Sequence, residues 1–146
     1  MEVAVILTSH GFFAQEALNS AQMIAGYKFE NCGVVSVSEG KDYTTCLEEL
    51  RELYNSLEIE AGVLILCDIY GGTPANISTY LAIEHPEIVV YTGFNLPILL
   101  EVLLTRKGKS IEEISRMIKE IYPISLTNIN EVMKGDSENG NQVDTY

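Results

Sequence analysis

Three short polar segments hold the residues of this chain that could do chemistry. They are residues 8–11 (Thr-Ser-His-Gly), residues 68–74 (Asp-Ile-Tyr-Gly-Gly-Thr-Pro) and residues 93–97 (Gly-Phe-Asn-Leu-Pro). Each segment follows an apolar run of strand length. In an open parallel sheet, ligands bind outside the carboxyl ends of the strands. We therefore expect the three segments to gather at one edge of a sheet.

His10 and Asp68 form the pair with the clearest chemistry. If the first and third predicted strands are neighbours, as in the flavodoxin-like order, these two side chains face each other where the strand order reverses. A carboxylate that accepts a hydrogen bond from one imidazole nitrogen orients the ring and leaves the other nitrogen free as a nucleophile. The pair therefore predicts a phosphoryl group carried on His10, with Asp68 as the residue that orients the ring.

The glycine-rich segment after Asp68 suits the oxygens of a phosphoryl group. At the start of a predicted helix, the N–H groups of Gly71, Gly72 and Thr73 have no helical acceptor, and the helix dipole favours negative charge there. Glycine permits close approach of the backbone to a ligand. We expect these three residues, with the Thr73 hydroxyl, to bind the phosphoryl group.

Each of these features also has a purely structural interpretation. The Gly-Gly-Thr-Pro segment can be a tight turn into a capped helix, and Asn95 with Pro97 can simply begin a helix. His85 is expected to be a surface residue. Cys67 is expected to be a core residue that faces away from the site, because strand side chains alternate. The convergence of three segments on one edge favours the functional interpretation.

Apolar runs alternate along the chain with segments of helical period. The runs are residues 3–7, 34–37, 63–67 and 88–91, and the helical segments are residues 12–25, 42–57, 74–84, 96–106 and 111–121. Continuous apolar runs are typical of strands that helices cover on both faces. The alternation predicts an α/β fold, a doubly wound and mostly parallel flavodoxin-like sheet of order 2-1-3-4 with helices on both faces.

The end of the chain is expected to differ from its body. Residues 124–126 (Ile-Ser-Leu) predict a short antiparallel strand, and the preceding Pro123 places it at an edge of the sheet. From Lys134 the sequence becomes polar and shows no apolar period. We expect one domain over residues 1–130 and a polar, disordered tail over residues 131–146.

The composition excludes several classes of partner. A chain of 146 residues with 47% hydrophobic residues is long enough for one packed domain. Its formal net charge of −12 argues against nucleic acid, because phosphate backbones bind clustered cations. The longest apolar runs fall far short of the ~20 residues that cross a bilayer. We expect a cytoplasmic protein.

Cysteine and histidine are too few for a metal or disulfide framework. The three cysteines, Cys32, Cys46 and Cys67, show no CxxC spacing, and the chain has only two histidines. Zinc sites need clustered Cys and His ligands. We expect free thiols, no metal and no cofactor.

Taken together, the three segments resemble a known family. Ser9-His10-Gly11, residues 68–76 and residues 93–97 are similar in type, order and spacing to the enzyme IIA domain of the mannose family of the bacterial sugar phosphotransferase system (PTS). The likeness runs from about residue 2 to residue 130. It matches His10 to the phosphorylated histidine of the family, Asp68 to the aspartate bonded to that histidine, and Thr73 to a nearby serine or threonine.

The resemblance implies a phosphotransferase that relays a phosphoryl group. In the family, the phosphocarrier protein HPr donates to the histidine, and a IIB domain accepts from it during sugar uptake through membrane IIC and IID components. Some relatives continue into a IIB domain, whereas this sequence ends in the polar tail. The resemblance therefore implies a IIB partner on a separate chain, with IIC and IID involved only indirectly. Selection of the sugar is expected to lie in those other components.

The resemblance also implies an assembly and a use for the charge. Members form homodimers by exchanging a C-terminal edge strand, which residues 124–126 would match. If the donor has a basic docking face, the net charge of −12 would attract it electrostatically and speed the encounter.

Two other functions remain open from the residues alone. One is a receiver-like signalling module phosphorylated on Asp68, although receivers carry acidic residues where residues 8–10 (Thr-Ser-His) stand. The other is a non-catalytic flavodoxin-like domain that binds FMN or an anionic metabolite. The sequence contains no GxxxxGK[ST] motif, so a P-loop kinase is not supported. A triad of Ser9 with His10 is excluded because adjacent strand residues point apart.

Overall fold

Four parallel strands form the centre of the molecule, and their order confirms the expected doubly wound fold. The computed structural model describes the backbone of residues 1–139 and the side chains of residues 1–136. The strands are β1 (Ala4–His10), β2 (Cys32–Val37), β3 (Val63–Cys67) and β4 (Ile88–Thr92), paired in the order β2-β1-β3-β4. Every pairing is parallel, so all four strands end at the same edge of the sheet.

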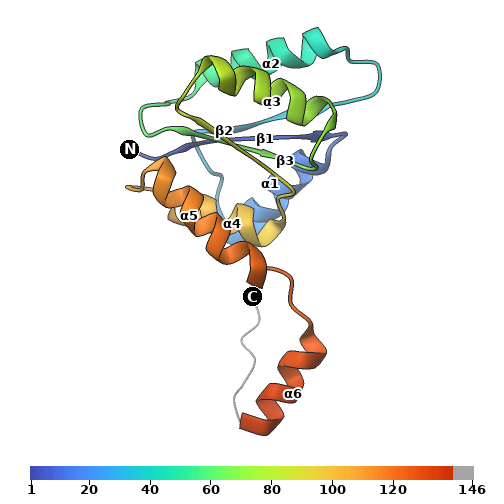
Figure 1. Cartoon of the computed structure of the whole chain (residues 1–146), viewed down its shortest axis with the longest axis vertical. Helices are drawn as coiled ribbons and strands as arrows, with labels where there is room; N and C mark the ends of the chain where they lie inside the picture. Colours follow the sequence, from blue (N-terminus) through green and yellow to red (C-terminus); the bar gives the residue numbers. More distant parts are fainter. Residues whose placement is uncertain (140–146) are drawn as a thin grey trace.

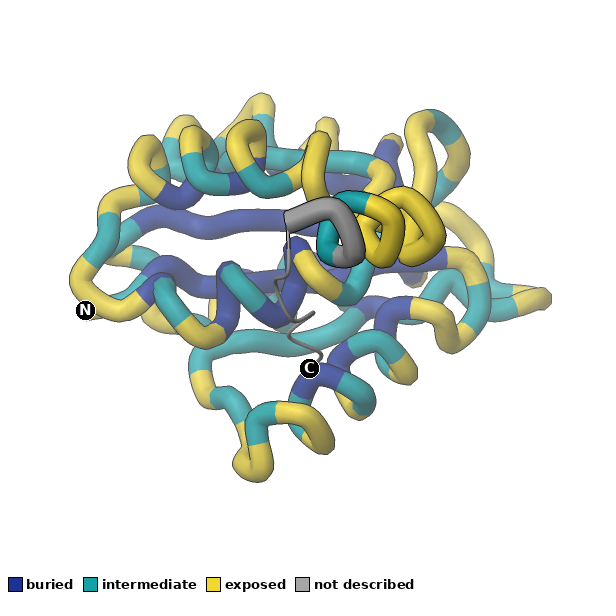
Figure 2. The backbone as a smooth tube through the Cα atoms, turned by 90° about the horizontal axis from the view of Figure 1, so that it is seen from below, coloured by how far each residue is buried: buried dark blue, intermediate teal, exposed yellow. Residues whose placement is uncertain are grey.

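Helices cover both faces of this sheet, as the continuous apolar runs predicted. Figure 1 shows α2 (Tyr43–Ser56) and α3 (Gly72–Glu84) on one face. On the other face lie α1 (Phe13–Ala25), α4 (Leu96–Thr105) and α5 (Ile111–Ile121). The sheet separates two apolar clusters because strand side chains alternate between its faces. In Figure 2 the two central strands, β1 and β3, are buried, the edge strands β2 and β4 are mostly of intermediate burial, and the outer sides of the helices are exposed.

Side-chain caps fix where several helices begin. The Asp42 carboxylate accepts a hydrogen bond from the Thr45 N–H at the start of α2. Ser110 forms the capping box that its spacing to Glu113 predicted, since each side chain bonds the backbone of the other residue. Such caps satisfy N–H groups that the helix itself leaves unpaired, and so they set the positions of the loops before them.

The prediction of an antiparallel edge strand at residues 124–126 is wrong. Tyr122–Ile124 form a short 3₁₀ helix, η1, and the Ser125 N–H closes its turn on the Tyr122 carbonyl at 3.2 Å. Pro123 favours this outcome, since its fixed φ suits the first turn of a helix. The Ser125 hydroxyl also donates to the Tyr122 carbonyl at 2.7 Å. A run of three residues carries too little pattern to distinguish a strand from a turn.

The segment expected to be a disordered tail contains a further helix, α6 (Ile129–Asn139). The Asn128 side chain accepts hydrogen bonds from the N–H groups of Asn130 and Glu131, which gives this helix a start that the polar composition concealed. Figure 1 shows α6 projecting from the α/β body. Residues 140–146 of the expected tail lie outside the described residues. The division of the chain at residue 130 stays a prediction.

Within residues 1–139, no helix combines the length and the apolar character needed to span a membrane.

Candidate functional site

His10 and Asp68 meet at the carboxyl edge of the sheet. His10 ends β1, and Asp68 directly follows β3, the neighbouring strand. The Nδ1 atom of His10 lies 2.8 Å from Oδ2 of Asp68, and the backbone N–H of His10 donates to the same oxygen at 2.9 Å. The His10 side chain is 51% exposed and that of Asp68 only 12%. The carboxylate is therefore a largely buried support for an accessible imidazole.

Asp68 is held in its charged form. Burial alone would raise the pKa of its carboxyl group, but hydrogen bonds from the His10 backbone, the His10 ring and the Ile69 N–H outweigh burial and keep this pKa below its usual value. The Ile69 N–H donates to Oδ1 at 2.9 Å. A carboxylate in this setting accepts a hydrogen bond from the Nδ1–H of the ring, which leaves the lone pair of Nε2 free.

The free side of the His10 ring lies against Gly72. A Cβ atom placed on Gly72 would be 3.0 Å from both Cε1 and Nε2 of His10, closer than side-chain carbons normally pack. Gly72 also has a φ of +82°, in the left-handed region that favours glycine. The absence of a side chain at Gly72 is what allows Nε2 to approach the start of α3.

The start of α3 presents unpaired backbone donors beside this nitrogen. Gly71 precedes the helix with a φ of +86°, and Gly72 and Thr73 form its first two residues. The first N–H groups of a helix have no intrahelical acceptor, and the dipole makes this end favourable for anions. In the described part of the chain, the Thr73 hydroxyl makes no hydrogen bond. Of the residues expected to bind a phosphoryl group, Gly72 thus lies at the ring, and Gly71 and Thr73 flank it along the chain.

The third segment supports the site without reaching it. The Asn95 side chain accepts from the Ile98 N–H at 3.0 Å and donates to the Ser125 hydroxyl at 2.8 Å. It therefore caps α4, as the structural interpretation of this segment expected. The Gly93 N–H donates to the Cys67 carbonyl at 3.0 Å, which ties the loop after β4 to the residue before Asp68.

The other residues considered in the sequence have structural roles. The Ser9 hydroxyl is buried and accepts from the Ala14 N–H at 2.8 Å, so it caps the start of α1. Cys67 lies in the core as predicted, and burial raises the pKa of its thiol to about 11. His85 is more engaged than a surface residue, because its ring packs on Tyr54 with centroids 4.5 Å apart and its Nδ1 lies 3.2 Å from the Tyr54 hydroxyl.

Exposed apolar side chains follow both His10 and Asp68 along the chain, and sequence reasoning did not single them out. They are Phe12, Phe13, Ile69 and Tyr70, which belong to the loops after β1 and β3 and the start of α1. Tyr70 is 92% exposed and Phe12 68%. The sequence did carry a signal for them, because large apolar side chains stand soon after the histidine and the aspartate at the two strand ends. Such a rim is typical of a surface that binds another protein.

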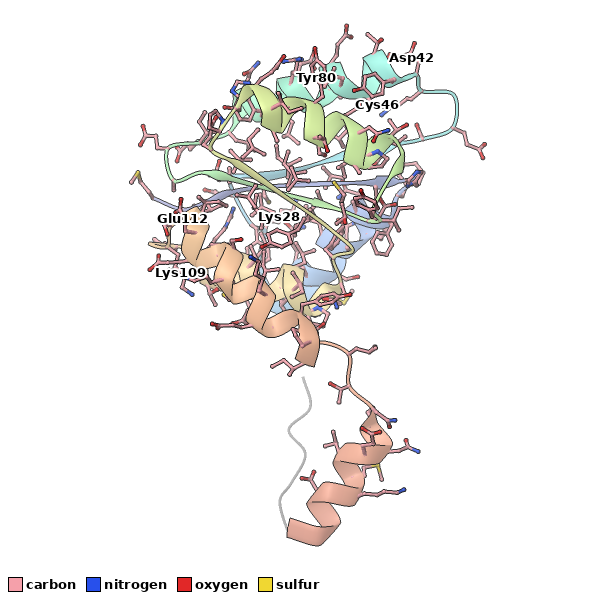
Figure 3. All side chains as sticks on the ribbon, viewed as in Figure 1. Lys28, Asp42, Cys46, Tyr80, Lys109 and Glu112 are labelled. Carbon is pink, nitrogen blue, oxygen red and sulfur yellow. The ribbon has the colours of Figure 1, made fainter. Side chains whose placement is uncertain are left out.

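Acidic side chains lie along the same edge. Glu16 in the first turn of α1 and Glu39 and Asp42 between β2 and α2 are exposed. Lys41 is nearby, but it pairs with Glu49 at 2.7 Å. Figure 3 shows Asp42 at the end of the molecule where β2 leads into α2, and Lys109 and Glu112 at the opposite end. Within the described residues, no three His, Cys, Asp or Glu side chains gather as a metal site would require.

Comparison with known proteins identifies the family. The model of the family "PTS system fructose IIA component" matches residues 4–119. The mannose-specific EIIAB component of Escherichia coli K12 is 31% identical over 106 residues, 73% of this chain and 32% of that protein, so this chain spans about a third of it. The fructose-specific EIIA component of Bacillus subtilis is 32% identical over 117 residues, 80% of each chain.

A solved structure agrees with the fold. The mannose/sorbose-specific IIA subunit from Enterococcus faecalis superimposes with a TM-score of 0.78 at 26% identity, over 88% of this chain and 95% of that one. The resemblance read from His10, Asp68 and the glycine-rich segment is thereby confirmed. The chain belongs to the mannose-type family of PTS IIA components.

Proposed function

We propose that this protein is a phosphotransferase that carries a phosphoryl group on Nε2 of His10, accepting it from HPr and passing it to a IIB protein. The observation that carries the proposal is the contact between His10 Nδ1 and Asp68 Oδ2 at 2.8 Å. It occupies one ring nitrogen and leaves the other beside Gly72, at the accessible start of α3. Family membership supports this function over a receiver module or a flavin-binding domain.

The transfer balances without any further reactant. The Nε2 lone pair of His10 attacks the phosphorus of the phosphorylated donor, a new N–P bond forms, and the donor's own bond to phosphorus breaks. The Nδ1 proton stays on the ring in its hydrogen bond to Asp68, which stabilises the positive charge that develops on the imidazole. The acceptor then attacks the same phosphorus, and the Nε2 lone pair returns to His10.

Gly71, Gly72 and Thr73 would hold the transferred group. Gly72 lies against Nε2, and Gly71 and Thr73 flank it at the start of α3. Their amides and the Thr73 hydroxyl would bind the oxygens of a phosphoryl group on Nε2, whose charge the dipole of α3 favours. The contact of Gly72 with the ring supports this assignment most directly. These groups supply the stabilisation that the transferred oxygens require.

Asp68 is poorly placed to accept a phosphoryl group itself, as a receiver module would require. Its Oδ2 accepts two hydrogen bonds from His10, and its Oδ1 accepts one from the Ile69 N–H. Attack by Oδ2 would break both hydrogen bonds to His10, and attack by Oδ1 would remove the negative charge that orients the ring. The carboxylate is therefore assigned to orienting the ring.

The partners and the assembly complete the proposal. Because HPr and the IIB protein must both reach His10, both would dock on the exposed apolar rim of Phe12, Phe13, Ile69 and Tyr70. We expect transfer to a IIB protein added as a separate chain, and a location in the cytoplasm. A homodimer is also expected, and sedimentation of the whole chain against a truncation before Pro123 tests it.

One labelling experiment tests the central claim. The protein is incubated with HPr, the upstream kinase of HPr and radiolabelled phosphoenolpyruvate. We expect one phosphate per chain that is labile in acid and stable in base, and none in His10→Ala. Phosphorylation that survives this substitution would overturn the proposal. Subsequent addition of IIB should remove the label.

A further inference from the structure

Phe94 joins the two loops that carry His10 and Asp68. Its backbone N–H lies 3.5 Å from the Cys67 carbonyl, which also accepts from the Gly93 N–H at 3.0 Å. Cys67 is the residue before Asp68. The loop after β4 is thus fixed to the end of β3, and Phe94 extends from it.

The ring of Phe94 contacts the other loop. It packs against the ring of Phe13 with centroids 5.5 Å apart and planes tilted by 51°. Phe13 opens α1, three residues after His10. Phe94 is 7% exposed and Phe13 is 53% exposed, so Phe13 rests with one side on a buried ring. Aromatic rings at this distance prefer a tilted or offset arrangement, so the pair restricts ring orientation more than burial of apolar area alone would.

An open pocket borders Phe94. It has a volume of about 370 Å³ and is lined by Phe94 with Leu66, Ile98, Ile118 and Tyr122 among others. Since side chains in protein interiors are held by close contacts, a ring beside open space can shift when a neighbour is lost. The contact with Phe13 is therefore one of the contacts that hold the Phe94 ring in place, together with its neighbours in the core.

We propose that the Phe13–Phe94 pair is a positioning element that holds the loop after His10 in register with Asp68 and Gly72. This inference rests on the proposed function. Neither ring is assigned a contact with the phosphoryl group. The pair acts through His10, by keeping the end of β1 and its imidazole where Nε2 faces the start of α3. Small displacements of a reacting group lower transfer rates steeply, because productive geometry is narrow.

The test compares Leu variants of the pair with a matched control. Phe94→Leu and Phe13→Leu keep apolar volume but remove the ring contact. The control is Phe29→Leu, because Phe29 also packs against the core and pairs with Tyr27 at 5.0 Å, but lies before β2 at the opposite edge of the sheet. Single-turnover transfer from phosphorylated HPr gives a rate constant and a half-saturating concentration. Amide hydrogen exchange at the His10 N–H reports its bond to Asp68 without requiring activity.

The expected pattern is specific to positioning. Each Leu variant of the pair should lose about tenfold in the rate constant at saturating donor, and exchange at the His10 N–H should accelerate. The half-saturating concentration should stay within about twofold in Phe94→Leu, whose ring is buried, whereas Phe13 also belongs to the proposed docking rim. The double variant should lose the same tenfold, since the two rings act as one contact. Phe29→Leu should keep the wild-type values. Wild-type rates in Phe94→Leu, multiplied losses in the double variant, or an equal loss in Phe29→Leu would overturn the inference. If the wild-type protein takes no label, the proposed function fails, and exchange at His10 still decides the positioning role.

Discussion

Asp68 binds His10 through two hydrogen bonds that end on the same oxygen. Oδ2 accepts from the His10 backbone N–H at 2.9 Å and lies 2.8 Å from Nδ1 of the ring. The shared oxygen couples the orientation of the imidazole to the position of the backbone at the end of β1. Because Oδ1 is held by the Ile69 N–H, the carboxylate has little freedom to rotate away. The ring is thereby placed before any partner arrives.

Asp68→Asn should fold but transfer phosphoryl groups more slowly. The amide has nearly the same shape but lacks the charge that stabilises a developing imidazolium. A hydrogen bond to a charged group contributes ~1.5–3 kcal/mol, so we expect a loss of about ten- to a hundredfold in the single-turnover rate constant. Asp42→Asn is a matched control, since Asn caps α2 as well as Asp does. At saturating donor the control should transfer at the wild-type rate, and a wild-type rate in Asp68→Asn would remove its role.

Gly72→Ala and Gly71→Ala separate contact with the ring from backbone strain. Both glycines have left-handed φ angles, +82° and +86°, so alanine strains each by ~1–2 kcal/mol. Only at Gly72 does the added Cβ meet the His10 ring, whereas nothing lies within 4 Å of it at Gly71. Urea unfolding should show similar destabilisation of the two variants.

The transfer rates of these glycine variants should differ. Displacement of Nε2 should slow Gly72→Ala about tenfold or more relative to Gly71→Ala. If both variants transfer equally fast, the close approach of the ring to α3 is unimportant for the reaction. Both proteins are assayed at the same donor concentration and at a temperature well below their unfolding transitions.

The sequence predicted the parts of the site that depend on local pattern. Continuous apolar runs identified the parallel strands, and parallel strands bring their ends to one edge, so the pairing of His10 with Asp68 followed from the residues alone. The glycines of the third loop were recognisable because a helix start and a close approach both need them. The prediction of a strand at residues 124–126 failed, because three residues are too few to show a period. The preceding Pro123 fits a 3₁₀ turn equally well.

Contacts between distant residues were beyond the reach of the sequence. Arg106 ends the predicted helical segment 96–106, and nothing in the sequence shows that it is 2% exposed and donates to the carbonyls of Val3 and Asn31 at 2.9 Å. Its guanidinium also lies 3.3 Å from the Glu2 carboxylate. These partners are far away along the chain. The pair of Phe13 and Phe94 was missed for the same reason, because neither ring carries a local signal for the other.

The depressed pKa of Asp68 predicts a specific loss of stability in acid. A carboxyl group whose folded pKa lies below its unfolded value of ~3.9 stabilises the fold at higher pH, and this contribution disappears as pH falls through the folded pKa. The difference in unfolding free energy between wild type and Asp68→Asn should therefore shrink as the pH falls below about pH 5. Urea titrations from about pH 7 down to about pH 2.5 measure it across the range in which the carboxyl group titrates. A difference that stays flat over this range would contradict the role of the hydrogen bonds.

Charge at the docking edge should make the encounter with HPr depend on salt. His10 is paired in register with Val37, and the exposed Glu39 and Asp42 follow within the same loop. Exposed charges act over about 8 Å at physiological ionic strength and less at higher salt. With a donor that has a basic face, the second-order transfer rate should fall about tenfold between low and high salt, while the rate at saturating donor stays constant. Glu39→Gln should lower the low-salt rate, and Glu112→Gln, at the opposite end of the molecule in Figure 3, should leave it unchanged. A second-order rate that ignores salt would show that the acidic edge does not steer the donor, since steering requires the unscreened field that salt removes.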